Sequence, residues 1–159
     1  MVNAGAEIVI QDLKSYLEDN VDANVTAVDA LMDVQLTPAA VSEWRIDDPL
    51  NGRLPTTLPV GWVVLPRWQV DQWNASSDHL TTDCVVWLLV RHQDAQVLEQ
   101  LAYRYAQGIW ETLKAGHYDS SITWQIVEFP MADFSAVRTR QSLLYKDIRI
   151  QLKLRTVQR

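Results

Sequence analysis

A regular alternation near the end of the sequence constrains the fold more than any other feature. One set of alternating positions is apolar except for a lysine: Leu144, Lys146, Ile148, Ile150, Leu152 and Leu154. The positions between them are mostly polar or charged: Tyr145, Asp147, Arg149, Gln151, Lys153 and Arg155. Because successive side chains of a strand point to opposite faces of a sheet, this pattern predicts a long strand with a core face and a charged face.

Three other segments have strand patterns. Residues 84–91 are apolar at nearly every position, which is typical of a central strand covered on both faces. Residues 122–127 alternate and predict a half-buried strand that ends near Pro130 and pairs antiparallel with the C-terminal strand. Residues 58–66 are bracketed by prolines, which predicts an edge strand because proline lacks the N–H donor of a ladder hydrogen bond.

Two helices are predicted from apolar residues spaced three and four apart. The first spans residues 5–19, with Asn20 as its stop, because asparagine tolerates the left-handed conformation at a helix end. Residues 21–36 fit either more helix or a short strand. The second helix begins after Asp94, a good N-cap, and runs to about Leu113, with Ala115-Gly116 as its end.

These elements predict an α+β fold with a mixed, mainly antiparallel sheet. The N-terminal helix and the long central helix are expected to pack on one face of that sheet. A chain of 159 residues fits one domain, residues 1–159. Residues 37–83 are expected to be irregular, because five of the six prolines and four of the seven tryptophans lie there.

Charge is unevenly distributed along the chain. The formal net charge is −6, the wrong sign for a protein that grips phosphates. The first 50 residues are strongly acidic, whereas residues 138–159 are basic, with Asp147 as their one acidic residue. This polarity suits head-to-tail contact between identical subunits, although two solvated faces would explain it equally well. The residues expected to meet across such a contact are Asp12, Glu18, Asp19 and Asp22 on one side and Arg149, Lys153 and Arg155 on the other.

The residues that carry chemistry elsewhere form no recognisable set in this sequence. There is no glycine-rich phosphate loop and no cysteine pair, and the three histidines lack metal-ligand spacing. We therefore predict no catalytic, cofactor or metal site. One alternative is a small ligand-binding domain or enzyme with a site near His92 and Asp94, at the end of the central strand. Cys84 lies in an apolar run, where burial would make its thiol inert.

No apolar stretch reaches the length of a membrane span, and the N-terminus lacks the pattern of a secretory signal. Cytoplasmic synthesis is therefore expected. Seven tryptophans are unusual in a chain of this size. Each one alone is more simply a core residue, but the group within residues 37–83 suggests a docking surface, because tryptophan is enriched at interfaces. Trp62, Trp68 and Trp73 are the interface candidates.

The order of these patterns resembles a known family. The strand Cys84 to Val90 leads through a turn with Asp94 into a helix that contains Leu101-Ala102-Tyr103-Arg104-Tyr105-Ala106 and Ile109-Trp110-Glu111-Thr112-Leu113. A strand follows, then the alternating segment 144–154, and a helix precedes the whole at residues 7–19. This layout resembles the tail terminator proteins of tailed bacteriophages and the neighbouring neck and tail-completion proteins. Residues 37–83 depart from the family pattern and would be a subunit-contact insertion.

The resemblance implies a structural virion protein without catalytic residues, cofactor or membrane contact. Such a protein forms a ring, commonly of six subunits, that caps the head-proximal end of the tail tube and joins it to the neck. Its partners would be further copies of itself, the tail-tube protein and neck or connector proteins, and it would be assembled into the virion in the host cytoplasm. DNA would pass through the ring only as cargo, and an acidic lumen would repel its phosphates. A head-completion adaptor between portal and tail is the alternative.

Overall fold

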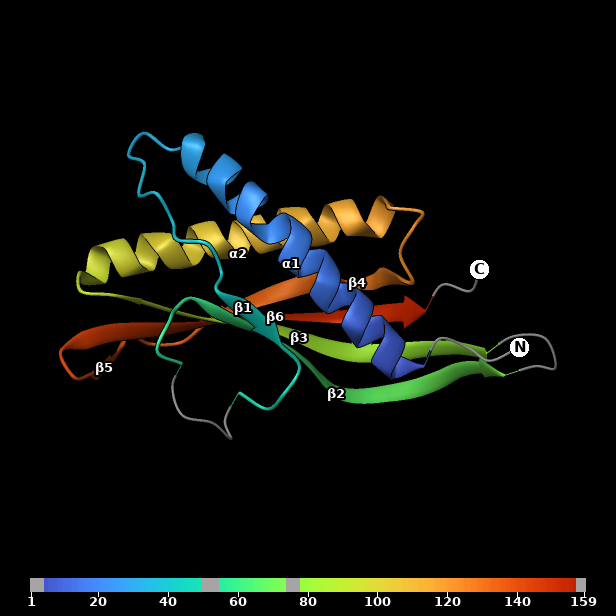
Figure 1. Ribbon diagram of the computed structural model, residues 1–159. Helices are drawn as coiled ribbons and strands as arrows, with labels where there is room; N and C mark the ends of the chain where they lie inside the picture. Colours follow the sequence, from blue (N-terminus) through green and yellow to red (C-terminus); the bar gives the residue numbers. More distant parts are fainter. Residues whose placement is uncertain (1–4, 50–54, 74–77, 157–159) are drawn as a thin grey trace.

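A computed structural model describes residues 5–49, 55–73 and 78–156 of the chain. Its elements, in chain order, are α1 (Ala6–Ala30), β1 (Glu43–Arg45), β2 (Val60–Trp73), β3 (Asp78–His92), α2 (Ala95–Tyr118), β4 (Trp124–Phe134), β5 (Arg138–Arg140) and β6 (Leu143–Thr156). Both helices lie on the same side of the sheet, and α1 crosses over α2 at an angle (Figure 1). Neither is long and apolar enough to cross a bilayer, as far as the described residues go.

The strands form one sheet whose order is β1-β2-β3-β6-β4, with β5 pairing the start of β6. Only β1 and β2 pair in parallel, and the other described pairs are antiparallel. The predicted α+β class, the mixed and mainly antiparallel sheet and the packing of both helices on one face are therefore confirmed, as is the antiparallel pairing of β4 with β6.

The main core lies between the helices and the central strands β3 and β6. The register places Leu88 opposite Ile148, and Val86 opposite Ile150, and none of these side chains is more than 2% exposed. The helices supply fully buried apolar residues to the same layer: Leu13, Leu17, Leu98, Ile109 and Leu113. Burial of a side chain of this size stabilises a fold by roughly 1.5–3 kcal/mol, so this layer is the main source of stability.

A buried ion pair fixes the connection that follows α1. Arg104 of α2 contacts the carboxylate of Asp29, and the side chains are 8% and 7% exposed. The same carboxylate accepts hydrogen bonds from the backbone N–H groups of Leu36 (3.0 Å) and Thr37 (3.1 Å). Arg104 also donates to the carbonyl oxygen of Val34, 2.8 Å away. This network therefore joins α1, α2 and residues 34–37.

The structure corrects the predicted ends of both helices. Helix α1 continues past Asn20 to Ala30, because Val21, Val25 and Val28 extend its buried apolar stripe. The Asn20 side chain donates to the carbonyl oxygen of Tyr16 within the helix. Helix α2 continues past Gly116 to Tyr118. A Cβ atom at Gly116 would lie 2.5 Å from the ring of Trp124, so glycine is required there for packing and does not end the helix.

Three strand predictions also need correction. Strand β4 runs through Pro130 to Phe134, with irregular register around Glu128, and it lies at the edge of the sheet where a missing N–H is tolerated. Strand β2 extends to Trp73 and pairs with β3, so residues 60–73 and 78–83 are sheet and not irregular. Its outer edge is covered by β1 only at Val60 to Trp62, so the predicted edge position holds only beyond Trp62.

Candidate functional site

The sheet has one face without helices, which we call the open face. In β3 and β6 it consists of the odd-numbered residues, since the even-numbered ones point toward the helices. The open face differs between its two ends: one end is apolar and buried, and the other is charged and accessible.

The apolar end is a small second core. Val60, Trp62, Leu89 and Tyr145 are each at most 8% exposed and pack together, with Leu58, Val64, Trp87 and Leu143 around them. Trp62 is 4% exposed in the single copy, where its indole packs into this second core. Its place in an interface stays a prediction. Trp68 and Trp73 belong to β2, and their side chains lie outside the described part of the structure.

The charged end carries a row of alternating charges across four strands. Arg67 of β2 is opposite Asp83 of β3, Asp83 is opposite Lys153 of β6, and Lys153 is opposite Glu128 of β4. The Arg67–Asp83 and Lys153–Glu128 pairs are each separated by 2.8 Å. We call these four residues the charge row.

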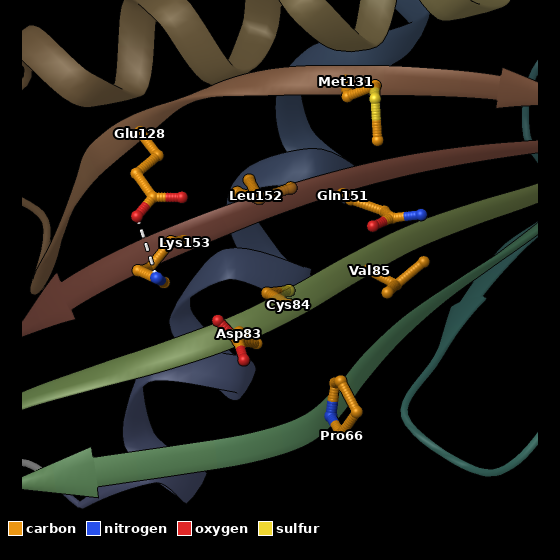
Figure 2. A pocket seen from close by; sticks show the side chains of 9 residues that line it. All are labelled: Pro66, Asp83, Cys84, Val85, Glu128, Met131, Gln151, Leu152 and Lys153. Atoms are coloured by element: carbon orange, nitrogen blue, oxygen red, sulfur yellow. Dashed lines mark hydrogen bonds and ion pairs between the residues drawn. The ribbon is translucent and has the colours of Figure 1, made fainter.

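A shallow hollow of about 370 Å³ lies along the charge row. Figure 2 shows Asp83, Glu128 and Lys153 around it, with Val85, Met131 and Gln151 nearby. Glu128 raises the pKa of the Lys153 ammonium by hydrogen bonding and by its charge, so Lys153 stays protonated at neutral pH. The hollow is open, and two carboxylates and one ammonium line it, which suits a polar protein surface better than an enclosed ligand.

A separate ion-pair cluster on the open face is centred on Asp147, which lies opposite Leu89. Its carboxylate, whose side chain is 4% exposed, contacts Arg138 at 2.6 Å and Arg149 at 3.4 Å. The Arg149 guanidinium also lies 4.0 Å from the centre of the Trp87 ring, a cation–π distance. Arg149 is therefore fixed by two neighbours within the same chain.

These contacts change the interpretation of the predicted basic set. Arg149 and Lys153 have acidic partners in their own chain, so they need no acidic neighbour from another subunit to balance them. Arg155 is exposed beside Thr81 and Gln125. Glu128 was missed from sequence, because its position opposite Lys153 depends on the irregular register of β4.

The predicted acidic set lies on α1, on the other side of the sheet. Asp12 accepts from the backbone N–H (2.8 Å) and the hydroxyl (2.7 Å) of Thr123, and Asp22 accepts from the N–H of Val41 at 2.9 Å. Glu18 pairs with Lys14 at 2.8 Å, and Asp19 is exposed. The acidic and basic sets do not meet within one copy. Their contact between copies stays a prediction.

The alternative site near His92 has a structural explanation. The Nδ1 atom of His92 accepts the backbone N–H of Asp94 at 3.0 Å, and Asp94 in turn caps α2 by accepting the N–H of Val97 at 2.9 Å. Both side chains thus shape the turn between β3 and α2. Cys84 is 1% exposed, and burial raises its pKa to about 12, as expected for an inert thiol. Among the described residues, no group of three or more His, Cys, Asp and Glu side chains is arranged to hold a metal ion.

A second accessible surface lies between α2 and the edge strand β4. Tyr103 and Phe134 meet edge to face, 5.1 Å apart, and they are 56% and 36% exposed. With Trp110 and Pro130 they line a hollow of about 390 Å³. Aromatic side chains are enriched at protein interfaces, so exposed aromatic groups that cluster in this way mark a candidate contact surface.

Comparisons with known proteins give remote likenesses among solved structures. No protein-family model matches the chain, and no curated protein matches it. Among solved structures, a chain in "Virion of native gene transfer agent (GTA) particle" is similar with a TM-score of 0.34 and 12% sequence identity. The alignment covers 87% of this chain and 94% of that chain. A likeness at this level does not define a shared function.

Proposed function

We propose that this chain is a structural virion protein that forms a ring at the head-proximal end of a phage tail. In that role it caps the tail tube, as a tail terminator does, and joins the tube to the neck. The chain would act by assembling with further copies of itself and with tail-tube and neck proteins, and it would carry out no chemical step.

The observation that carries the proposal is the arrangement of the elements. The resemblance to tail terminators rests on an N-terminal helix, a central strand, a long helix and two further strands, and the fold contains these elements in that order in one sheet. Both helices lie on one face, which leaves a charged open face. Among the described residues, the edges of β2 and β4 are uncovered over much of their length. Uncovered edges and faces are where subunits meet.

The overall charge fits the proposed role. At a net charge of −6, a ring of several copies repels the DNA backbone and lets it pass without adhering. We therefore expect no measurable duplex binding by the isolated chain at physiological salt. A fluorescence anisotropy titration that gave affinity falling steeply with salt would indicate phosphate contacts instead.

The test is assembly on a tail tube. Light scattering and negative-stain microscopy would follow the purified chain alone and with tubes formed by the tail-tube protein of the same virus. The expected result is a ring, and density at one end of each tube. A chain that stays monomeric and leaves both ends bare would overturn the proposal. Density between portal and tail in whole particles, and none on the tube, would indicate the neck adaptor.

A further inference from the structure

The charge row ends in opposite charges at opposite edges of the sheet. Across β2, β3, β6 and β4 the signs alternate from Arg67 to Asp83 to Lys153 to Glu128. The inner Asp83 and Lys153 side chains are 30% and 29% exposed, whereas the outer Arg67 and Glu128 are 73% and 63% exposed. Each end of the row therefore has room for one more partner of opposite charge.

The two outer strands are also the uncovered edges of the sheet. Among the described residues, no strand pairs with β4 on the side away from β6, and none pairs with β2 beyond Trp62 on the side away from β3. Through the chain of antiparallel pairs β2-β3-β6-β4, strands β2 and β4 run in opposite directions. A second copy placed beside the first, with the same face outward, would thus set its β2 antiparallel to β4 of the first.

We infer that copies of this chain associate edge to edge, with β4 of one copy beside β2 of the next and Glu128 beside the next copy's Arg67. The inference rests on the proposed ring and names its subunit contact. The alternation of charge then runs unbroken from copy to copy. The contact is head to tail. It therefore closes into a ring when the rotation that relates neighbouring copies is a whole-number fraction of a full turn.

Charge also disfavours the competing two-fold arrangements. If β4 met β4 in register, Glu128 would face Glu128, and if β2 met β2, Arg67 would face Arg67. Like charges directly opposite on neighbouring strands are destabilising. Only the head-to-tail arrangement places opposite charges at the row ends.

Side chains dominate this contact, because both edges are interrupted. Pro66 lies at a register shift in β2, and Pro130 lies within the irregular part of β4, so a continuous backbone ladder between copies is not expected. Next to the β4 edge, the hollow lined by Tyr103, Trp110 and Phe134 adds apolar surface that a neighbour would cover. The charged residues thus determine how the two edges align, and burial of the apolar surface stabilises the association.

The test uses two charge reversals, Glu128→Arg and Arg67→Glu, in the full chain. Each variant alone places like charges at every contact and should raise the concentration needed for half-assembly by about tenfold or more. An equal mixture restores opposite charges at every contact of a ring in which the two variants alternate. Sedimentation velocity should therefore show that the mixture assembles as the wild type does. Arg91→Glu, an exposed reversal within the inner strand β3 of the same face, is the matched control and should assemble normally.

The outcomes separate the contact from the proposed function. If both variants assemble normally, or if the mixture stays as weak as either variant, the edge contact is overturned, while capping of tail tubes by the wild type would still uphold the ring. If only one of the two variants is weakened, Glu128 and Arg67 do not face each other across the contact, and the inferred edge contact is overturned. If the mixture assembles but no protein binds tail tubes, the edge contact stands and the tail-terminator function fails. Circular dichroism on the same samples confirms that each variant is folded.

Discussion

The two faces of the sheet use charge in different ways. On the helix-covered face, Asp29 and Arg104 are both buried and join α1, α2 and residues 34–37. On the open face, Asp147 is equally buried, but its partners Arg138 and Arg149 are 59% and 46% exposed. When a buried ion pair loses one member, the remaining charge stays buried without a partner or water, which is costly. An exposed arginine that loses its partner is hydrated, and the cost is small. The helix-covered face therefore stabilises the fold, and the open face presents charge to the outside.

The largest expected effect is the loss of the buried pair on the helix-covered face. Asp29→Ala leaves Arg104 buried without its partner and removes the acceptor for the N–H groups of Leu36 and Thr37. We expect the free energy of unfolding to fall by about 3–5 kcal/mol. Urea denaturation followed by circular dichroism would measure it. A loss below about 1 kcal/mol would mean that Arg104 reaches water in the native state.

The same carboxylate gives a pH dependence. Burial alone would raise its pKa, but hydrogen bonds from Leu36, Arg104 and Thr37 outweigh this and lower the pKa below 3.8. A lowered pKa in the folded state means that the carboxylate stabilises the fold fully above pH 3.8 and loses this contribution as the pH falls through the folded value. The wild type should thus lose more stability than Asp29→Asn on acidification below this pH. Parallel curves for the two proteins would contradict the assignment.

The matched substitution on the open face should cost less. Asp147→Ala removes the acceptor of Arg138 and Arg149, but both guanidinium groups are already partly hydrated. Arg149 also keeps its place over Trp87. We expect a loss of about 1–2 kcal/mol, measured in the same urea titration. A loss equal to that of Asp29→Ala would show that the two faces do not differ in the way described.

The reaction rates of thiols at the adjacent positions 84 and 85 would compare the accessibility of the two faces. Cys84 packs into the main core and is 1% exposed, whereas Val85 is half-buried on the open face. In Val85→Cys, the new thiol should react with a disulfide reagent much faster than Cys84 does. Cys84 of the wild type should react only as the chain unfolds, because burial raises its pKa to about 12. Equal rates for the two thiols would contradict the burial of Cys84.

The features that could be predicted from sequence are those that a local residue pattern determines. The core face of β6 was predicted correctly because alternation reports directly on burial, and the N-cap role of Asp94 follows from local chemistry. The polar exception Lys146 proved to be buried and paired with Glu99 at 2.7 Å, a contact between α2 and β6 that no local pattern shows.

Features that depend on register and tertiary contact were missed. Strand β2 was predicted as a short segment, because Pro66 suggested an end where the structure has a register shift. The charge row was not predicted, since it joins residues from four strands and requires the irregular register near Glu128. Tyr145 and Asp147 were expected on a solvated face, yet both are buried, because the open face carries a second core and an ion-pair cluster.

Hydrogen–deuterium exchange at two protein concentrations, one below and one above assembly, tests the use of the open edges most directly. If copies meet edge to edge, amide exchange should slow on assembly in peptides that cover residues 63–67 of β2 and residues 126–134 of β4. Peptides from the centre of β3 and from α2 residues facing the core should change little, because they are protected in the single copy. If assembly instead protects α1 and leaves both edges unchanged, subunits meet through the helix layer, and the assembly role assigned to the open edges is wrong.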